Sequence, residues 1–448
     1  MSRLTRLFPF VLALAVTLGL GLAGVGADAG TPRVASAAAA SVPLPHDDPF
    51  YAYTGSTPLT NIAPGTVLNT RAVTVGVPGS GSGVLPATQL LYRTQDERKK
   101  PSVTVTTVVN PAGPLATGVV GYLSFYDALG DICDPSYTLR GGDPGQSNTE
   151  LADTEAGLVS TLAAEGYAVT VPDFEGEDLH WVAGQESGWS SLDAIRATES
   201  YLGMASTTKV GLFGYSGGSI AGEWAAELAP RYSPDLNIVG TAVGGLPVDL
   251  AHNLKYVDGS QDWSGVMPAV LVGLGRAFGV NMRKYESAYG KTITKTVRNQ
   301  CIGSFNGNYP GLTVAKLVKP RYRHLLRVPA FARIVNKLIM GSAPGHPISP
   351  LFLGVGNADG TGDHVMIAKD VEALGHEYCS QGVTVQFTEY PGSEHTQAGL
   401  QFFPAAESYL AQRFLGLPPT NGCASIGPGN SLKPLKIRHK HHHHHHHR

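Results

Sequence analysis

The feature that most constrains the fold is the sequence GYSGG, centred on Ser216 and placed between an apolar run and an alanine-rich segment. The apolar run predicts a buried strand over residues 210–213, and the following Ala, Glu and Leu predict a helix over residues 219–228 that ends before a proline. A serine is exposed at such a sharp turn only if Gly214 and Gly218 let strand and helix come close, as in a nucleophile elbow. The alternative is a serine in an ordinary tight turn, but the flanking strand and helix favour the elbow.

The rest of the pattern predicts an α/β protein with a mainly parallel central sheet flanked by helices. Alternating β-branched and polar residues near the N-terminus indicate antiparallel strands, and strands then alternate with helices, which implies parallel crossovers. The predicted strands are residues 67–76, 87–94, 102–110, 118–124, 167–171, 236–244, 350–356 and 383–390, and the predicted helices are residues 153–165, 187–201, 365–375 and 403–415.

This alternation stops for about a hundred residues. Residues 250–349 contain helical stretches and Gly-rich turns but no segment typical of a strand. They divide the core into residues 49–249 and residues 350–430. An insertion between two sheet strands lies beside their carboxyl ends, so we expect a helical cap over the site. The alternative is a packing domain with no gating role.

The two ends of the chain predict export and terminal tails. Two arginines and an uncharged stretch lead into small residues typical of a cleavage site, so we expect residues 1–29 to be a secretory signal peptide. An uncleaved membrane anchor is the alternative. Residues 30–48, rich in Ala, Ser and Pro, should form a disordered leader, and residues 431–448 a basic, histidine-rich tail of native or engineered origin.

The cysteines agree with an extracellular location. The chain has 4 cysteines, which fits an oxidising compartment and two disulfides, with three pairings open. No two lie close enough in sequence to suggest a metal site, and we expect neither metal nor cofactor. We expect no nucleic acid as a partner, and no obligate protein partner is inferred.

Residues after the elbow supply the groups that would activate a serine. A serine nucleophile needs a histidine base and a carboxylate that orients it, in the chain order Ser, Asp or Glu, His. His395 lies in a turn after the last predicted strand, whereas His364 and His376 are more typical of surface histidines. Asp359 and Asp363 both follow the strand over residues 350–356, and the pattern leaves the choice between them open.

Beyond these groups, the chain resembles the secreted lipase family typified by lipase A of Candida antarctica. The shared motifs are the elbow and residues 126–127, 133–137, 173–176, 236–240, 244–248 and 394–396. The resemblance implies an α/β hydrolase that cleaves triacylglycerols and other esters with Ser216, His395 and an aspartate, under a helical cap. In the family a hydrophobic residue and a proline follow this aspartate; the proline is missing after Asp363. Counting back from Cys379 nevertheless favours Asp363 over Asp359.

The same resemblance implies further roles. The backbone N–H groups of Asp127 and Gly217 would form the oxyanion hole, with the Asp127 side chain either turned away or protonated, since a carboxylate repels an oxyanion. The four cysteines would pair as two disulfides. These are Cys133 with Cys301, and Cys379 with Cys423.

The sequence therefore predicts a secreted carboxylic ester hydrolase, foremost a triacylglycerol lipase working through an acyl-enzyme at a lipid–water interface. An acyltransferase, a polyester or sterol esterase, and an inactive binding protein are the alternatives. The insertion is also basic. Residues 251–349 hold 14 Lys and Arg against 3 Asp and Glu, a net charge of +11. This charge either attracts the acidic core or adsorbs to anionic lipid.

Overall fold

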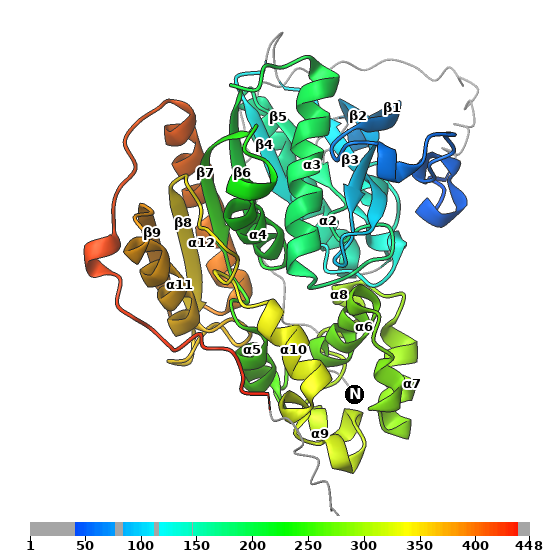
Figure 1. Ribbon diagram of the computed structural model, residues 1–448, viewed down its shortest axis with the longest axis vertical. Helices are drawn as coiled ribbons and strands as arrows, with labels where there is room; N and C mark the ends of the chain where they lie inside the picture. The colour runs from blue at the N-terminus through cyan, green and yellow to red at the C-terminus, as the bar shows by residue number, and fades with distance from the viewer. Residues whose placement is uncertain (1–40, 77–83, 112–115, 146, 438–448) are drawn as a thin grey trace, which may run out of the picture. The chain divides into compact units, whose positions relative to one another are not determined.

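The computed structural model describes residues 41–76, 84–111, 116–145 and 147–437 (Figure 1). The predicted signal peptide and the histidine tract lie outside these residues. Part of the predicted leader is ordered: residues 45–47 form a short 3₁₀ helix with Pro45 buried, and the Asp48 carboxylate pairs with Arg71 at 2.7 Å. A packed contact of this kind overrides the disorder that the composition of residues 30–48 predicts.

One sheet organises the described chain. Its nine strands lie in the order β1-β2-β3-β5-β4-β6-β7-β8-β9 (Figure 1). The pairs β1–β2, β2–β3 and β3–β5 are antiparallel, and all the other pairs are parallel. The strands are β1 Val67–Gly76, β2 Val84–Gln95, β3 Pro101–Val109, β4 Val119–Leu123, β5 Ala168–Pro172, β6 Lys209–Tyr215, β7 Asn237–Gly244, β8 Leu351–Asn357 and β9 Val385–Pro391. The mainly parallel sheet is therefore confirmed.

Helices cover both faces of the sheet. Alternate residues of β8 show the two sides: Leu351 and Leu353 belong to the apolar cluster that includes residues of α11, whereas Phe352 packs against Phe402 and Tyr409 of α12 on the other side. α3 lies against α4 and shares its apolar cluster. The helices of the core are α1 Pro135–Thr138, α2 Ser147–Ala164, α3 Gly184–Leu202, α4 Gly217–Tyr232, α11 Ala368–Ser380 and α12 His395–Phe414.

Helix boundaries differ from the sequence predictions in several places. α4 continues through Pro230 to Tyr232, because the N–H of Ser233 closes the final turn on the Ala229 carbonyl. α2 begins six residues before the predicted start, and α11 begins and ends later than predicted. α12 begins at His395 rather than near residue 403, since the Glu394 side chain caps the helix and accepts the N–H groups of two following residues. The predicted turn is therefore shorter than expected: it covers residues 392–394, and His395 is the first residue of the helix.

The insertion between β7 and β8 is helical throughout its described elements. It contains α5 Leu250–Val257, α6 Val266–Phe278, α7 Ala288–Val297, α8 Ile302–Phe305, α9 Val314–Leu317 and α10 Pro329–Lys337 (Figure 1). We call this segment the cap. The start of the predicted tail packs on it, because the backbone of Leu435 forms two hydrogen bonds with the Asn336 side chain, at 2.9 and 2.7 Å.

Candidate active site

Ser216 lies at the turn between β6 and α4. Its backbone has φ 55° and ψ −121°, a region that side chains rarely adopt and that costs about 1–3 kcal/mol. The glycines on either side are required by contact: a Cβ on Gly214 would lie 2.2 Å from the Gly218 carbonyl oxygen, and one on Gly218 would lie 1.9 Å from the Leu123 carbonyl oxygen. The turn therefore has the strained, closely packed geometry that the elbow interpretation requires.

Three side chains from separate parts of the chain form one hydrogen-bonded series. His395 Nε2 lies 2.8 Å from Ser216 Oγ, and His395 Nδ1 lies 2.7 Å from Asp363 Oδ2. The other oxygen of Asp363 accepts the backbone N–H groups of Val365 and Met366, at 3.1 and 2.7 Å. Asp363 and His395 are buried, and Ser216 is partly exposed. This series can move the proton of a serine hydroxyl to an oriented imidazole.

Asp359, the other candidate acid, has a different environment. One of its oxygens accepts the N–H groups of Thr361 and Gly362, both at 2.9 Å, and the other accepts the Tyr256 hydroxyl at 2.7 Å. Its side chain is exposed and stabilises the turn. Of the two aspartates, only Asp363 contacts His395.

The electrostatics of His395 favour its charged form. Burial lowers the pKa of His395, but the charge of Asp363, the hydrogen bond to it and the nearby Glu394 and Asp127 carboxyl groups together outweigh burial, so the pKa is raised above its usual value. The ring of Trp263, from the cap, lies edge-on against the imidazole with centroids 5.1 Å apart. The base is thus fixed on one side by a carboxylate and on another by an apolar ring.

Asp127 follows β4 and faces the elbow. Its backbone has φ 38°, and a Cβ on Gly217 would lie 2.0 Å from its Oδ1 atom. Among the described residues, the N–H groups of Asp127 and Gly217 have no hydrogen-bond acceptor. Two free N–H groups beside a serine can receive the oxygen of a tetrahedral intermediate.

The Asp127 side chain is neither solvated nor paired with a cation. Oδ1 accepts the indole N–H of Trp181 at 2.8 Å. Burial raises the pKa of Asp127 to about 7, although the Trp181 hydrogen bond and the charge of His395 both act to lower it. The carboxyl group is therefore largely neutral below that pH. The sequence left open whether the Asp127 side chain is turned away or protonated, and this pKa favours the protonated state.

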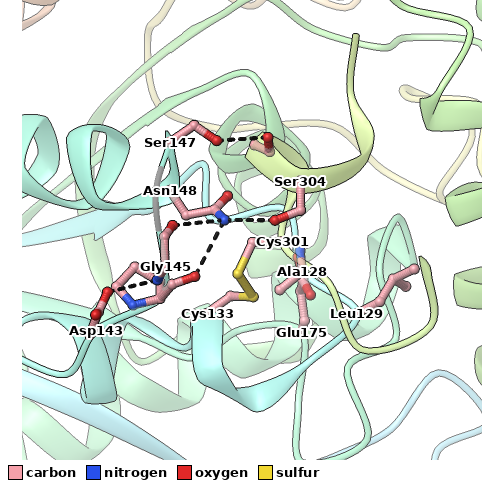
Figure 2. The surroundings of a disulfide bond; sticks show 12 residues. Ala128, Leu129, Cys133, Asp143, Gly145, Ser147, Asn148, Glu175, Cys301 and Ser304 are labelled. Atoms are coloured by element: carbon pink, nitrogen blue, oxygen red, sulfur yellow. Dashed lines mark hydrogen bonds between the residues drawn. A yellow bond between two sulfur atoms is a disulfide. The ribbon is translucent and has the colours of Figure 1, made fainter. Parts of the chain in front are cut away.

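The loop that carries Asp127 is attached to the cap. The N–H of Leu129 donates to the Gln300 carbonyl at 3.0 Å, Ala128 forms a β-bridge with Cys301, and a disulfide joins Cys301 to Cys133 (Figure 2). On the core side, Glu175 accepts the Ala128 N–H at 3.1 Å. Cap and core therefore hold this loop between them.

The second disulfide links Cys379 to Cys423, so both pairs are those that the family resemblance implies. A mostly apolar cavity opens beside Ser216. Its walls come from the core and the cap and include Trp181, Ile220, Leu254, Trp263, Val270 and Met366. Sequence reasoning missed both tryptophans, because no motif marks them and their positions depend on how the cap packs. Glu175 could have been suspected, since it lies in one of the shared motifs.

The described residues contain neither a metal-binding cluster nor a helix that could span a membrane. No cluster of three or more His, Cys, Asp or Glu side chains there is arranged to hold a metal ion. In the same residues, every helix is too short or too polar to cross a bilayer.

The sheet, the serine turn and the hydrogen-bonded histidine together define the class of α/β hydrolases with a cap inserted after the strand that follows the elbow. Within this class, the secretory lipase family matches residues 143–422, and the chain belongs to that family. It is 32% identical over 389 residues to the secreted triacylglycerol lipase LIP2 of Malassezia furfur, covering 84% of this chain and 81% of the relative. It is also 31% identical over 392 residues to the probable inactive lipase MT1628 of Mycobacterium tuberculosis, covering 84% of both.

Solved structures agree with this assignment. Lipase A of Candida antarctica superposes with a TM-score of 0.77 at 28% identity, over 89% of this chain and 92% of that one. The cell-wall-degrading esterase LipA of Xanthomonas oryzae matches at a TM-score of 0.61 but only 15% identity, over 80% of this chain and all of its own length, so it supports the fold alone.

Proposed function

We propose that this protein is a secreted serine lipase that hydrolyses triacylglycerols and related carboxylic esters through an acyl-enzyme. The observation that carries the proposal is the series Asp363–His395–Ser216, with both bonds at 2.7–2.8 Å, next to two unpartnered N–H groups. Family membership supports an ester as the substrate, and the secretory family and two disulfides support export.

The residues would act in two half-reactions. Ser216 Oγ attacks the ester carbonyl carbon while its proton passes to His395 Nε2, and Asp363 stabilises the imidazolium that forms. The carbonyl oxygen becomes an oxyanion that accepts the N–H groups of Asp127 and Gly217, each contributing about 3 kcal/mol. His395 then protonates the departing alcohol, and the carbonyl re-forms as an acyl-serine. Water attacks the acyl-serine by the same route and releases the acid and free Ser216.

The relative described as probably inactive makes an inactive hydrolase fold the main competing proposal. Against it stands the strained backbone of Ser216, which costs stability and contributes nothing to a structural turn. A binding protein would have no reason to retain that strain together with a buried histidine aligned on the serine.

Substitution and labelling test the proposal. Ser216→Ala and His395→Ala should each lower kcat on p-nitrophenyl butyrate by about 10⁴-fold or more while the protein still folds. His376→Ala is the matched control, because His376 bonds only a backbone carbonyl at 3.1 Å, far along the chain from the elbow. A fluorophosphonate should label Ser216 of the wild type alone. Wild-type turnover by Ser216→Ala would end the proposal.

A further inference from the structure

We infer that Trp181 is a positioning residue of the oxyanion hole: its indole N–H holds the Asp127 carboxyl group aside, so that the two backbone N–H groups stay free for the substrate oxygen. The inference rests on the proposed function and adds to it a residue that acts through Asp127 rather than on the reacting atoms.

The Asp127 carboxyl group lies close enough to the hole to block it. Its Oδ1, Cγ and Oδ2 atoms stand 2.0, 2.7 and 2.9 Å from the place that a Cβ on Gly217 would take. An ionised carboxyl oxygen is a stronger acceptor than an ester carbonyl, and the N–H groups of Asp127 and Gly217 have no acceptor among the described residues. A carboxyl group without a partner of its own would therefore turn toward these N–H groups and take the place of the substrate oxygen.

The indole of Trp181 supplies that partner. Its Nε1 donates to Asp127 Oδ1 at 2.8 Å, and both side chains are buried. Within the described part of the chain, the Asp127 carboxyl group makes no other hydrogen bond. The orientation of the carboxyl group is therefore set by the position of Trp181.

The backbone around Trp181 is held in an unusual conformation. Leu179 and Val182 have φ angles of 51° and 63°, values that residues with branched side chains rarely adopt and that cost stability. Between them, the N–H of His180 donates to the Glu175 carbonyl at 2.9 Å. Strain of this kind persists only where the surrounding contacts fix it.

A buried histidine–carboxylate pair provides such a contact. His180 Nδ1 lies 2.6 Å from Glu186 Oε2, and both residues are buried. Glu186 is bound in turn to Glu97, because each carboxyl group accepts the backbone N–H of the other residue, at 2.7 and 3.1 Å. None of these side chains lines the cavity beside Ser216, so the proposed chemistry leaves them without another role. We assign them to holding the segment that presents Trp181.

The cap encloses Trp181 from the other side. The indole packs against Phe305 with ring centroids 5.7 Å apart. A Cβ on Gly273 of α6 would lie 2.5 Å from the Trp181 carbonyl oxygen, so this helix touches the backbone as well. Core and cap together fix the direction in which the indole N–H points.

Substitution of Trp181 tests the inference. Trp181→Phe removes the donor and keeps an aromatic ring, so kcat on p-nitrophenyl butyrate should fall about tenfold, the effect of one hydrogen bond, with KM unchanged. Trp181→His should recover part of this loss, because Nε2 of an imidazole can take the position of the indole Nε1. Trp189→Phe is the matched control, since Trp189 is a buried tryptophan of α3 that packs against Tyr232.

Two further measurements separate positioning from a structural role. A butyl trifluoromethyl ketone adds to Ser216 and places its oxygen, as an oxyanion, in the hole, so its Ki should rise about tenfold in Trp181→Phe. Asp127→Gly keeps the backbone N–H, tolerates the φ of 38° and has no carboxyl group. In that background Trp181→Phe should change kcat and Ki by less than about twofold.

The outcomes are distinguishable. A loss of the same size with and without the Asp127 carboxyl group overturns the inference, because Trp181 would then act by packing alone. An unchanged Ki in Trp181→Phe overturns it as well. If the wild type neither turns over the ester nor binds the ketone, the proposed function itself is wrong.

Discussion

At the scale of single residues, the two aspartates after β8 differ in their contacts and should differ in their effects. Asp363 is buried and bonds His395, whereas Asp359 is exposed and holds a turn. Asp363→Asn should lower kcat by about 10⁴-fold, because the amide orients the wrong imidazole tautomer. Asp359→Asn should cost less than about tenfold and mainly lower the melting temperature. Steady-state kinetics of both variants decide the matter, and the reverse ranking would contradict the assignment of the acid.

Asp127 should give the enzyme an alkaline limit. Its pKa of about 7 means that the carboxyl group is neutral below this pH and charged above it. A charge beside the forming oxyanion opposes it, so kcat should fall as the pH rises through about 7. The same charge acts to raise the pKa of His395. Asp127→Asn keeps the backbone N–H but cannot ionise.

The pH profile of kcat on p-nitrophenyl butyrate tests this role. In Asp127→Asn the alkaline decline should disappear, because the amide cannot ionise. An alkaline decline of the same size and midpoint in variant and wild type would show that another group causes it.

At the scale of structural elements, the two disulfides should have separable roles. Cys133–Cys301 closes a loop of 168 residues and Cys379–Cys423 one of 44, which correspond to about 5 and about 4 kcal/mol in the chain-entropy model. Only the first is attached to the loop that carries Asp127 (Figure 2).

Replacing each pair by serines tests this separation. Both double variants should lose stability, measured by denaturant unfolding, and the Cys133→Ser/Cys301→Ser variant should lose more. It alone should also lose kcat, measured at a temperature where it remains folded, because the Asp127 N–H is no longer held in place. Equal kcat losses in the two double variants would argue against a positioning role.

At the scale of the whole molecule, the basic side chains of the cap form no direct salt bridge within the described chain. In that part, none of the 14 Lys and Arg side chains of residues 251–349 forms a salt bridge with a carboxylate. Arg321, Arg323 and Arg327 lie in the segment just before α10, and their side chains are exposed. Direct ion pairing with the acidic core therefore does not account for the charge, and adsorption to anionic lipid stays a prediction beside attraction between cap and core.

Vesicle binding tests adsorption. Changing Arg321, Arg323 and Arg327 to Gln should weaken binding to anionic vesicles by up to about 100-fold, at roughly 1 kcal/mol per charge. The matched control changes Arg98, Lys99 and Lys100, three exposed cations of the core, and should have little effect. Near 0.5 M salt, where the Debye length is about 4 Å, wild-type binding should weaken while soluble ester hydrolysis stays constant. Equal binding of the wild type to neutral and anionic vesicles would exclude adsorption through the basic residues of the cap.

Local patterns determined much of the fold. The bounds of β1 were predicted without error, and every other predicted strand is present within three residues at each end, because alternation and turn residues act over short distances. The elbow was equally readable, since strand, glycines and helix are contiguous in sequence. The start of α12 was not readable from the sequence, because its N-cap residue is a glutamate and Pro404 lies inside the helix.

Only the tertiary structure decided which groups meet. Asp359 and Asp363 lie four residues apart in one loop, and their spacing to His395 cannot show which carboxylate reaches a ring 32 residues further on. Trp181 and Trp263 carry no motif, yet the packing of the cap brings one to Asp127 and the other to His395. Local sequence sets backbone conformation through short-range sterics, whereas contacts between distant side chains depend on how complete elements pack.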